Sequence, residues 1–100
     1  MFEVQQSATF ATWLVRLRDL RAKAIIARRV QRMALGNFGD ATTVGERVSE
    51  LRVDVGPGYR IYFTRRGTEV VILLCGGDKG SQRRDIALAK TMAAEMHDGN

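Results

Sequence analysis

The sequence has few of the residues that bind metals or act as nucleophiles in enzymes. Its 100 residues include one cysteine, Cys75, and one histidine, His97. A single cysteine excludes a disulfide within the chain, and these two ligands are too few for a zinc site. Catalysis by a Ser-His or Cys-His pair has no good candidate either. We therefore expect neither a metal nor a cofactor, and an inert, buried thiol at Cys75.

Long hydrophobic runs and targeting segments are also missing. The longest apolar run, Val70 to Cys75, is far too short to span a bilayer. Because this run is apolar on both faces, it predicts a central strand that is covered on both sides. Residues 1–12 include Glu3 and two glutamines, and they contain no apolar segment of the kind that a signal peptide has. We therefore expect a cytoplasmic protein with no membrane partner.

Positive charge, by contrast, is in excess. The chain has 16 Lys and Arg against 11 Asp and Glu, which gives a formal net charge of +5 at pH 7. Such a balance favours a polyanionic partner such as nucleic acid, although many basic proteins bind none. The apolar content of 45% is ordinary for a globular chain. The length predicts a single domain over residues 1–100.

Hydrophobic periodicity predicts a strand, two helices, a run of strands and a last helix. Ser7 or Thr9 can cap the first helix, Asp19 can cap the second, Gly36-Asn37 can end it, and Ser81 can cap the last helix. The expected strands are 2–5, 43–46, 48–55, 59–65 and 69–76, and the second and last helices are 20–35 and 82–97. This order predicts an α+β fold, with helices packed on one face of a mostly antiparallel sheet.

A patch of basic side chains is expected on the open face of this sheet. Residues two apart on a strand share a face, so Arg52 and Arg60 should lie together on neighbouring strands, with Tyr62 beside Arg60. Lys79 follows the last strand, where Gly76-Gly77 should let the backbone turn sharply. Two guanidiniums, an ammonium and a phenol are then expected to converge on one spot that faces solvent.

Such a patch suits a phosphodiester. Arginine offers a bidentate fork to phosphate oxygens. RNA supplies its own nucleophile, the 2′-hydroxyl, so an enzyme needs mainly to align it and to stabilise charge. The candidates for the base and the acid are Lys79, Tyr62, Asp78 and Glu50. In the alternative interpretation, Arg52 pairs with Glu50 or Asp54 in a surface ladder, and the chain is a small interaction domain.

A second basic surface follows the second predicted helix. Seven of the 16 basic residues lie between positions 16 and 32, and Asp19 is the only acid among them. Like charges at helical spacing repel one another, so this face is expected to meet an anionic surface such as RNA. A solvated helix face explains the pattern equally well. The expected RNA-binding residues here are Arg21, Arg28 and Arg32.

Three motifs stand in the second half of the chain. They are Glu50-Leu-Arg-Val-Asp54, Gly56-Pro-Gly-Tyr-Arg-Ile-Tyr-Phe63 and Leu74-Cys-Gly-Gly-Asp-Lys79, followed by Gln82 and Asp85-Ile-Ala87. Together they closely resemble the RelE/ParE superfamily. The nearest branch is the phage-derived, HigB-like "addiction module killer" toxins of bacterial type II toxin–antitoxin systems. The resemblance covers nearly the whole chain, and the length also fits.

The resemblance implies a RelE-like fold and a toxin that inhibits translation by cutting mRNA, usually on the ribosome. It also implies a cognate antitoxin, in this branch often a helix-turn-helix DNA-binding protein. The strand arginine of the family corresponds to Arg60, the basic residue after the last strand to Lys79, and the strand residue before the turn to Arg52. The aromatic or acidic catalytic residues that some relatives carry near the C-terminus have no clear match in this chain, which has only Arg83, Arg84 and Asp85 near that place in the last helix. We expect Arg83 and Arg84 to contact RNA.

Two other functions fit the same resemblance. A ParE-like inhibitor of DNA gyrase would be a protein-binding poison, and it would not need aligned arginines on the open sheet face. An inactive module would be retained only for operon control with its antitoxin. The chain also departs from the pattern of the family at Gly80, where relatives commonly carry serine or threonine, and at Arg47, where they carry a small residue.

Overall fold

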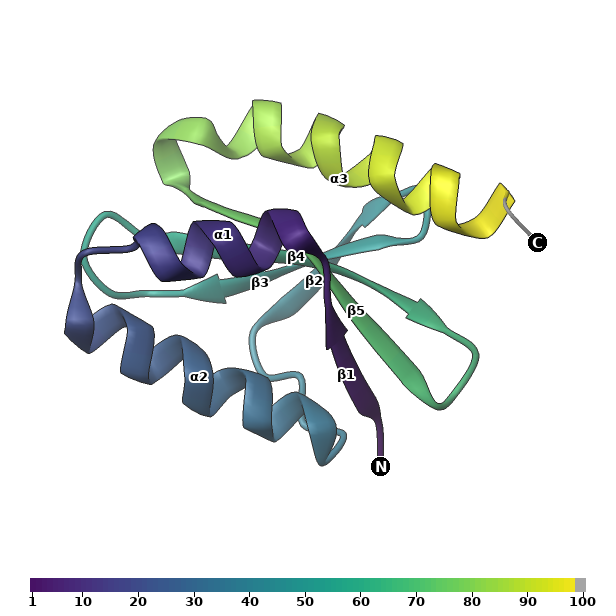
Figure 1. Ribbon diagram of the computed structural model, residues 1–100, viewed down its shortest axis with the longest axis horizontal. Coiled ribbons are helices and arrows are strands. Elements are labelled where there is room, and N and C mark those ends of the chain that lie inside the picture. The colour runs from purple at the N-terminus through teal and green to yellow at the C-terminus, as the bar shows by residue number, and fades with distance from the viewer. Residues whose placement is uncertain (99–100) are drawn as a thin grey trace.

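The chain folds around a five-stranded sheet with helices on both sides (Figure 1). The computed structural model describes residues 1–98. The elements are β1 (Glu3–Gln6), α1 (Ala8–Arg16), α2 (Leu20–Ala34), β2 (Ala41–Gly45), β3 (Val48–Val53), β4 (Tyr59–Arg66), β5 (Val70–Asp78), the short 3-10 helix η1 (Lys79–Ser81) and α3 (Gln82–Asp98). The α+β order predicted from the sequence is confirmed.

The strands lie in the order β1-β5-β4-β3-β2. β3 pairs antiparallel with β2 and with β4, and β4 pairs antiparallel with β5. β1 runs parallel to β5 at one edge of the sheet. The chain leaves this edge through α1 and α2 and returns at the opposite edge as β2 (Figure 1). The sheet is therefore mostly antiparallel, as predicted.

Local sequence signals set the ends of the first two helices. Ser7 caps α1, because its side chain accepts a hydrogen bond from a backbone N–H in the first turn. Asp19 caps α2 in the same way. α2 ends before Gly36, whose φ of 89° is readily adopted by glycine because it has no Cβ. These positions confirm the predicted caps, with Ser7 rather than Thr9 at the start of α1.

One face of the sheet packs against α1 and α2. The apolar residues that alternate with the two strand arginines point to this side. They meet Phe10 of α1 and Ile26 and Met33 of α2, all fully or almost fully buried. The buried residues that β3 and β4 contribute are Leu51, Val53, Tyr59, Ile61 and Phe63.

The other face of the sheet packs against α3. Ala89 and Ala93 of this helix are fully buried against Tyr62, Leu74 and Cys75. The small alanine side chains let the helix approach the sheet closely. The prediction that the helices cover a single face is therefore wrong, because α3 folds back over the face that was expected to be open.

Gly76 and Gly77 belong to β5 and do not form a turn. The strand continues to Asp78, and neither glycine has a positive φ. Neither position has room for a side chain, because a Cβ on Gly76 would overlap the ring of Trp13 and a Cβ on Gly77 would overlap the carboxylate of Asp85. The predicted sharp turn is wrong. The two glycines instead let Trp13 and α3 approach opposite sides of the strand.

Candidate nucleic-acid site

Three connections of the chain meet at one end of the sheet, on the left in Figure 1. They are the α1–α2 connection, the β3–β4 turn and η1. Asp19 Oδ2 lies 3.4 Å from the place that a Cβ on Gly56 would take, and Lys79 Cβ lies 3.7 Å from the corresponding place on Gly58. Lys79 is exposed at this end. The structure thus brings Lys79 beside the β3–β4 turn, and the predicted convergence of its ammonium with the two guanidiniums stays a prediction.

Arg52, Arg60 and Gly77 form a row across β3, β4 and β5. The register pairs Arg52 with Arg60, and Arg60 with Gly77. Paired residues on neighbouring antiparallel strands point to the same face, so the prediction that the two arginines are neighbours is confirmed. The adjacent row pairs Glu50 with Tyr62. A carboxylate therefore lies directly beside the two cations.

The two arginines differ greatly in exposure. The side chain of Arg52 is 48% exposed, whereas that of Arg60 is 8% exposed. Tyr62, which was expected on the open face with Arg60, is also buried. The prediction of a solvent-facing patch is therefore correct for Arg52 and wrong for Arg60 and Tyr62, because α3 covers their face of the sheet.

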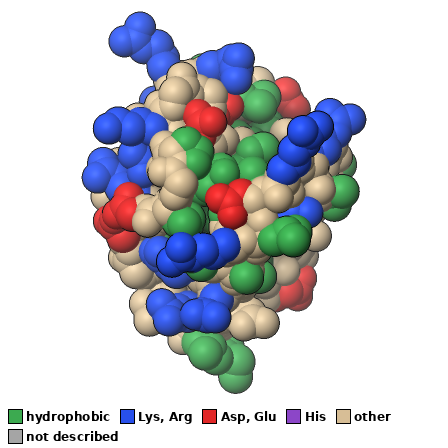
Figure 2. Space-filling model, turned by 90° about the vertical axis from the view of Figure 1, so that its left-hand side faces the viewer, with side chains coloured by type: hydrophobic (Ala, Val, Ile, Leu, Met, Phe, Trp, Pro, Cys, Tyr) green, Lys and Arg blue, Asp and Glu red, His purple; other side chains and the backbone are tan. Residues whose placement is uncertain are grey.

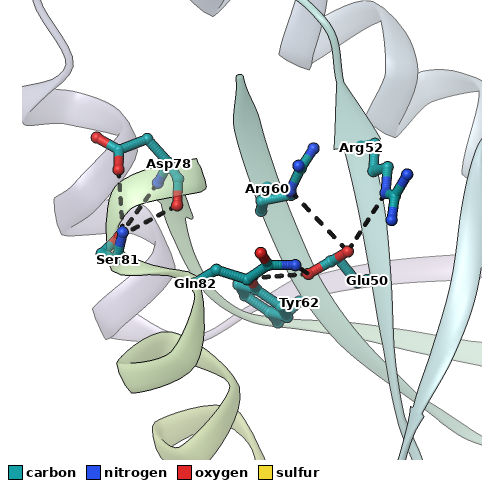
Figure 3. A network of polar contacts seen from close by, with 7 residues as sticks. All are labelled: Glu50, Arg52, Arg60, Tyr62, Asp78, Ser81 and Gln82. Atoms are coloured by element: carbon teal, nitrogen blue, oxygen red, sulfur yellow. Dashed lines mark hydrogen bonds and ion pairs between the residues drawn. The ribbon is translucent and has the colours of Figure 1, made fainter. Parts of the chain in front are cut away.

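Glu50 links the residues of this cluster (Figure 3). Its Oε2 accepts hydrogen bonds from the Tyr62 hydroxyl at 3.0 Å and from Nε2 of Gln82 at 2.7 Å. Its Oε1 lies 3.5 Å from Nε of Arg52 and 4.0 Å from Nε of Arg60. Glu50 itself is only 2% exposed. A carboxylate buried this deeply needs hydrogen-bond donors and cations such as these around it.

Arg60 has hydrogen-bonding capacity that the described part of the protein does not use. Its Nε and Nη1 are buried, and neither has a hydrogen-bond partner among residues 1–98. The 4.0 Å separation from Glu50 is too long for a hydrogen bond. A buried donor without a partner costs about 1–3 kcal/mol. The arrangement therefore favours an acceptor with several oxygens, such as a phosphate, which an arginine fork fits.

Tyr62 is enclosed and donates its hydroxyl to Glu50. Burial, together with the charge of Glu50 and the hydrogen bond to it, raises the pKa of the Tyr62 phenol above its ordinary value of 10.0. The phenol therefore keeps its proton near neutral pH. In this structure Tyr62 holds Glu50 in place, and its predicted part in catalysis stays a prediction.

A capped turn fixes the residues that follow β5. Asp78 Oδ1 accepts hydrogen bonds from the backbone N–H groups of Gly80 at 2.8 Å and Ser81 at 3.2 Å. The Ser81 hydroxyl donates to the buried carboxylate of Asp85. Ser81, predicted as the cap of the last helix, is instead the third residue of η1 and closes a capping box with Asp78. This turn holds the backbone of Lys79 at the margin of the cluster.

Arg83 and Arg84 lie in the first turn of α3, directly after Gln82, and both are exposed. Their position next to Gln82 puts this predicted RNA-binding pair on the element that contacts Glu50. Figure 2 views the molecule from this end and shows Lys and Arg side chains spread over it, with acidic and apolar side chains between them. The surface is therefore mixed and not uniformly basic.

Arg21, Arg28 and Arg32 are exposed on α2. α2 and α3 pack on opposite faces of the sheet, so the structure does not bring these three arginines together with Arg60. Arg21 lies in the first turn of α2, near the three connections, whereas Arg28 and Arg32 lie further along the helix. They form a basic surface separate from the Glu50 cluster.

Gln82 is the member of the cluster that sequence reasoning missed. It stands 32 positions from Glu50, and its contact exists only because α3 folds back over the sheet. Its place at the start of the last helix could be predicted, but no local pattern indicates a bond over that separation. Glu50 was a predicted candidate for proton transfer, and its pairing with Arg52, expected in the alternative interpretation, is present. Its contacts with Arg60, Tyr62 and Gln82 were not predicted.

Residues 1–98 contain neither a cluster of metal ligands nor a membrane-spanning helix. Within this range, no three or more His, Cys, Asp or Glu side chains are grouped so that they could hold a metal ion. None of the helices in the same range combines the length and the hydropathy needed to cross a bilayer. Cys75 is buried, and desolvation together with the nearby Asp85 raises the pKa of its thiol to about 12. The thiol is therefore protonated near neutral pH and poorly reactive.

Comparison with known proteins gives a relative that matches nearly the whole chain. A protein of Haemophilus influenzae (strain ATCC 51907 / DSM 11121 / KW20 / Rd) is 47% identical over 94 residues. The match covers 94% of this chain and 95% of that protein, which is described as uncharacterized. No protein-family model matches the chain. The similarity therefore spans both the helical hairpin and the Glu50 cluster.

Proposed function

The chain belongs to the same family as the Haemophilus influenzae protein, and we propose that it is the toxin of a type II toxin–antitoxin module. Its proposed activity is that of an endoribonuclease that cuts mRNA on the translating ribosome and so inhibits translation. The resemblance of its motifs to the HigB-like branch of the RelE/ParE superfamily supports this proposal. The α+β layout, with a helical hairpin before the sheet and a helix after it, is consistent with a RelE-like fold.

The unused hydrogen-bonding capacity of Arg60 is the observation that carries the proposal. Two of its nitrogens are buried without a hydrogen-bond partner among residues 1–98. A structural arginine at this depth would be expected to satisfy its donors within the protein. An arginine that binds a phosphodiester keeps them for the substrate. Arg52 and Lys79, which are both exposed near this end of the sheet, add positive charge where the backbone of RNA would approach.

The proposed reaction uses the nucleophile that RNA carries. The 2′-oxygen forms a bond to the adjacent phosphorus while the bond from phosphorus to the 5′-oxygen breaks, giving a 2′,3′-cyclic phosphate and a 5′-hydroxyl. The proton lost from the 2′-hydroxyl is balanced by the proton that the leaving 5′-oxygen gains. Arg60 binds the non-bridging oxygens, and Arg52 and Lys79 stabilise the added negative charge. The protein thus contributes mainly alignment and electrostatics.

The four predicted candidates for proton transfer differ in how they are engaged. The carboxylate of Asp78 accepts hydrogen bonds from two backbone N–H groups of η1. The hydroxyl of Tyr62 is buried against Glu50. Lys79 is exposed beside the cluster. We therefore assign proton transfer to Lys79 or to Oε1 of Glu50, the oxygen that faces the guanidiniums.

The proposed partners are mRNA, the ribosome and a cognate antitoxin of the helix-turn-helix type, all in the cytoplasm. Arg83 and Arg84 would contact the RNA next to the cluster. Arg21, Arg28 and Arg32 would contact ribosomal RNA from α2, because an exposed set of arginines favours a phosphate backbone.

Induced expression in a bacterial host tests the proposal. Transcript ends and chromosomal breaks are mapped in the same cells, with Arg60→Ala as the inactive variant and Lys90→Ala as a surface control. The proposal predicts cuts within translated codons that disappear in Arg60→Ala and persist in Lys90→Ala. Double-strand breaks without transcript cuts would instead indicate a gyrase poison. The absence of both, with normal growth, would indicate an inactive module.

A further inference from the structure

The two oxygens of the Glu50 carboxylate have different partners. Oε2 accepts two hydrogen bonds, one from the hydroxyl of Tyr62 on β4 and one from the amide of Gln82 on α3. Oε1 has two cations nearby, Nε of Arg52 at 3.5 Å and Nε of Arg60 at 4.0 Å. Figure 3 shows both guanidiniums above the carboxylate, with Gln82 to its left and Tyr62 below it. The carboxylate is therefore held through Oε2, the oxygen that is not the one near Arg60.

Glu50 and Arg60 do not form the stronger, bidentate pair that an arginine and a carboxylate commonly make. Glu50 and Arg60 are both almost completely buried, and an arginine and a carboxylate commonly form two parallel hydrogen bonds at about 2.8 Å. Such a pair would satisfy one of the two buried donors of Arg60, Nε or Nη1, that lack partners among residues 1–98. It would also occupy the guanidinium edge that an anion needs. The bonds from Tyr62 and Gln82 oppose this pairing, because it requires both carboxylate oxygens and Oε2 is already held by these two donors.

We infer that Gln82 and Tyr62 are positioning residues that hold Glu50 away from Arg60 and so keep the guanidinium available for a phosphate group. Glu50 then has two effects. Its charge stabilises Arg60 in a buried place, and its restrained position prevents it from competing fully with the ligand. The inference rests on the proposed function only in taking the phosphate to be that of an RNA backbone.

Of the two positioning residues, Gln82 is the better one to replace in a test. It is the first residue of α3, so its bond to Glu50 forms only when the start of this helix lies against the sheet. Tyr62 belongs to the sheet itself and is fully buried within the apolar cluster. Replacing Gln82 therefore removes one restraint on Glu50 and leaves the core intact. Tyr62→Phe removes the other restraint and keeps the ring.

The test follows the Nε–H resonance of Arg60 by NMR while inorganic phosphate is added to the full chain. In the wild-type protein, phosphate is expected to shift this resonance. In Gln82→Leu, Glu50 keeps only the bond from Tyr62 and can approach Arg60 more closely, so the affinity for phosphate should fall about 10-fold, corresponding to the loss of one charge-assisted hydrogen bond. Before phosphate is added, exchange of the Nε–H proton with solvent should slow, because it now has an acceptor. Gln31→Leu, at an exposed position on α2, is the matched control and should behave as the wild type.

Removal of the Glu50 charge separates positioning from a general structural role. In a Glu50→Gln background, Gln82→Leu should no longer weaken phosphate binding, because the competing carboxylate is gone. An equal loss of affinity in both backgrounds would overturn the inference. If Glu50→Gln proves too unstable to study, the single variants decide: faster or unchanged Nε–H exchange in Gln82→Leu and in Tyr62→Phe also overturns it.

The outcome is distinguishable from a failure of the proposed function. If the phosphate results hold but no RNA is cut, the positioning of Glu50 stands and the nuclease assignment fails. If RNA cleavage depends on Arg60 but Gln82→Leu binds phosphate as the wild type does, the nuclease assignment stands and the positioning role of Gln82 fails.

Discussion

Arg52 and Arg60 face each other across β3 and β4, yet the side chain of Arg52 is 48% exposed and that of Arg60 is 8% exposed. Both have their Nε atoms within 4.0 Å of the same Glu50 oxygen. An exposed guanidinium is hydrated and mobile, whereas a buried one is fixed and acts in a medium of low dielectric constant. The two arginines are therefore expected to contribute unequally to the proposed RNA cleavage.

Arg60→Ala should abolish growth inhibition, whereas Arg52→Ala should reduce it only in part. Removal of a preorganised cation from the site of charge development commonly costs about 100-fold or more in rate, and an exposed cation contributes less because water screens it. The measurement is colony formation after induced expression, with protein levels checked. Binding of a co-expressed antitoxin should survive in both variants. A folded Arg60→Ala protein that is as toxic as the wild type would remove Arg60 from the site.

Lys79→Gln should lower the rate of RNA cleavage without changing the stability of the fold. Lys79 is exposed, and its backbone is held by the capping of η1, which does not use the ammonium. The loss should be about 10-fold or more if the ammonium stabilises the reacting phosphate. Lys90→Gln, which breaks a surface ion pair with Glu46, is the matched control. Equal rates of RNA cleavage by the two variants would show that Lys79 does not belong to the site.

Gly77→Ala should destabilise the protein far more than Gly67→Ala. A Cβ on Gly77 would overlap the carboxylate of Asp85 and the hydroxyl of Ser81, so the start of α3 would have to move. Gly67 has open space around it, and alanine there costs only the strain of a positive φ, about 1 kcal/mol. Urea denaturation of both variants provides the comparison. Equal losses of unfolding free energy would show that β5 and α3 are less closely packed than described.

Tyr62→Phe should make the stability of the protein less sensitive to alkaline pH. The pKa of Tyr62 is raised above 10.0 in the fold, so the folded chain holds this proton more tightly than the unfolded chain does. The stabilisation is complete below the unfolded pKa of 10.0 and is lost as pH rises above it. The wild-type unfolding free energy should therefore fall more steeply there, by at most about 1.4 kcal/mol per pH unit for this group. Parallel curves for wild type and variant would contradict the prediction.

The sequence predicted the parts of the cluster that depend on local geometry. Side chains alternate between the two faces of a strand, and the Gly-Pro-Gly segment at 56–58 is typical of a turn between two strands. These two features placed Arg52 and Arg60 on one face of a hairpin. Helix caps at Ser7 and Asp19 also follow from neighbouring atoms. These features require no knowledge of how distant segments pack.

Burial of Arg60 and the contact of Gln82 with Glu50 could not be predicted in the same way. Both depend on α3 docking against the sheet, which is a matter of tertiary packing over a large sequence separation. The apolar run from Val70 to Cys75 correctly predicted a strand that is covered on both sides. The order of the elements wrongly suggested that the helices cover only one face of the sheet. Gly76-Gly77 misled for a related reason, since these glycines serve close packing and not a turn.

The chemistry of the cut ends tests the central claim most directly, namely that Arg60 binds an RNA phosphodiester whose own 2′-hydroxyl is the nucleophile. Purified protein is incubated with ribosomes translating a defined mRNA, and the termini of the fragments are identified. The account predicts upstream fragments ending in a 2′,3′-cyclic phosphate, downstream fragments with a 5′-hydroxyl, and no cleavage by Arg60→Ala. Intact mRNA with the wild-type protein, or fragments with 3′-hydroxyl and 5′-phosphate ends, would contradict it.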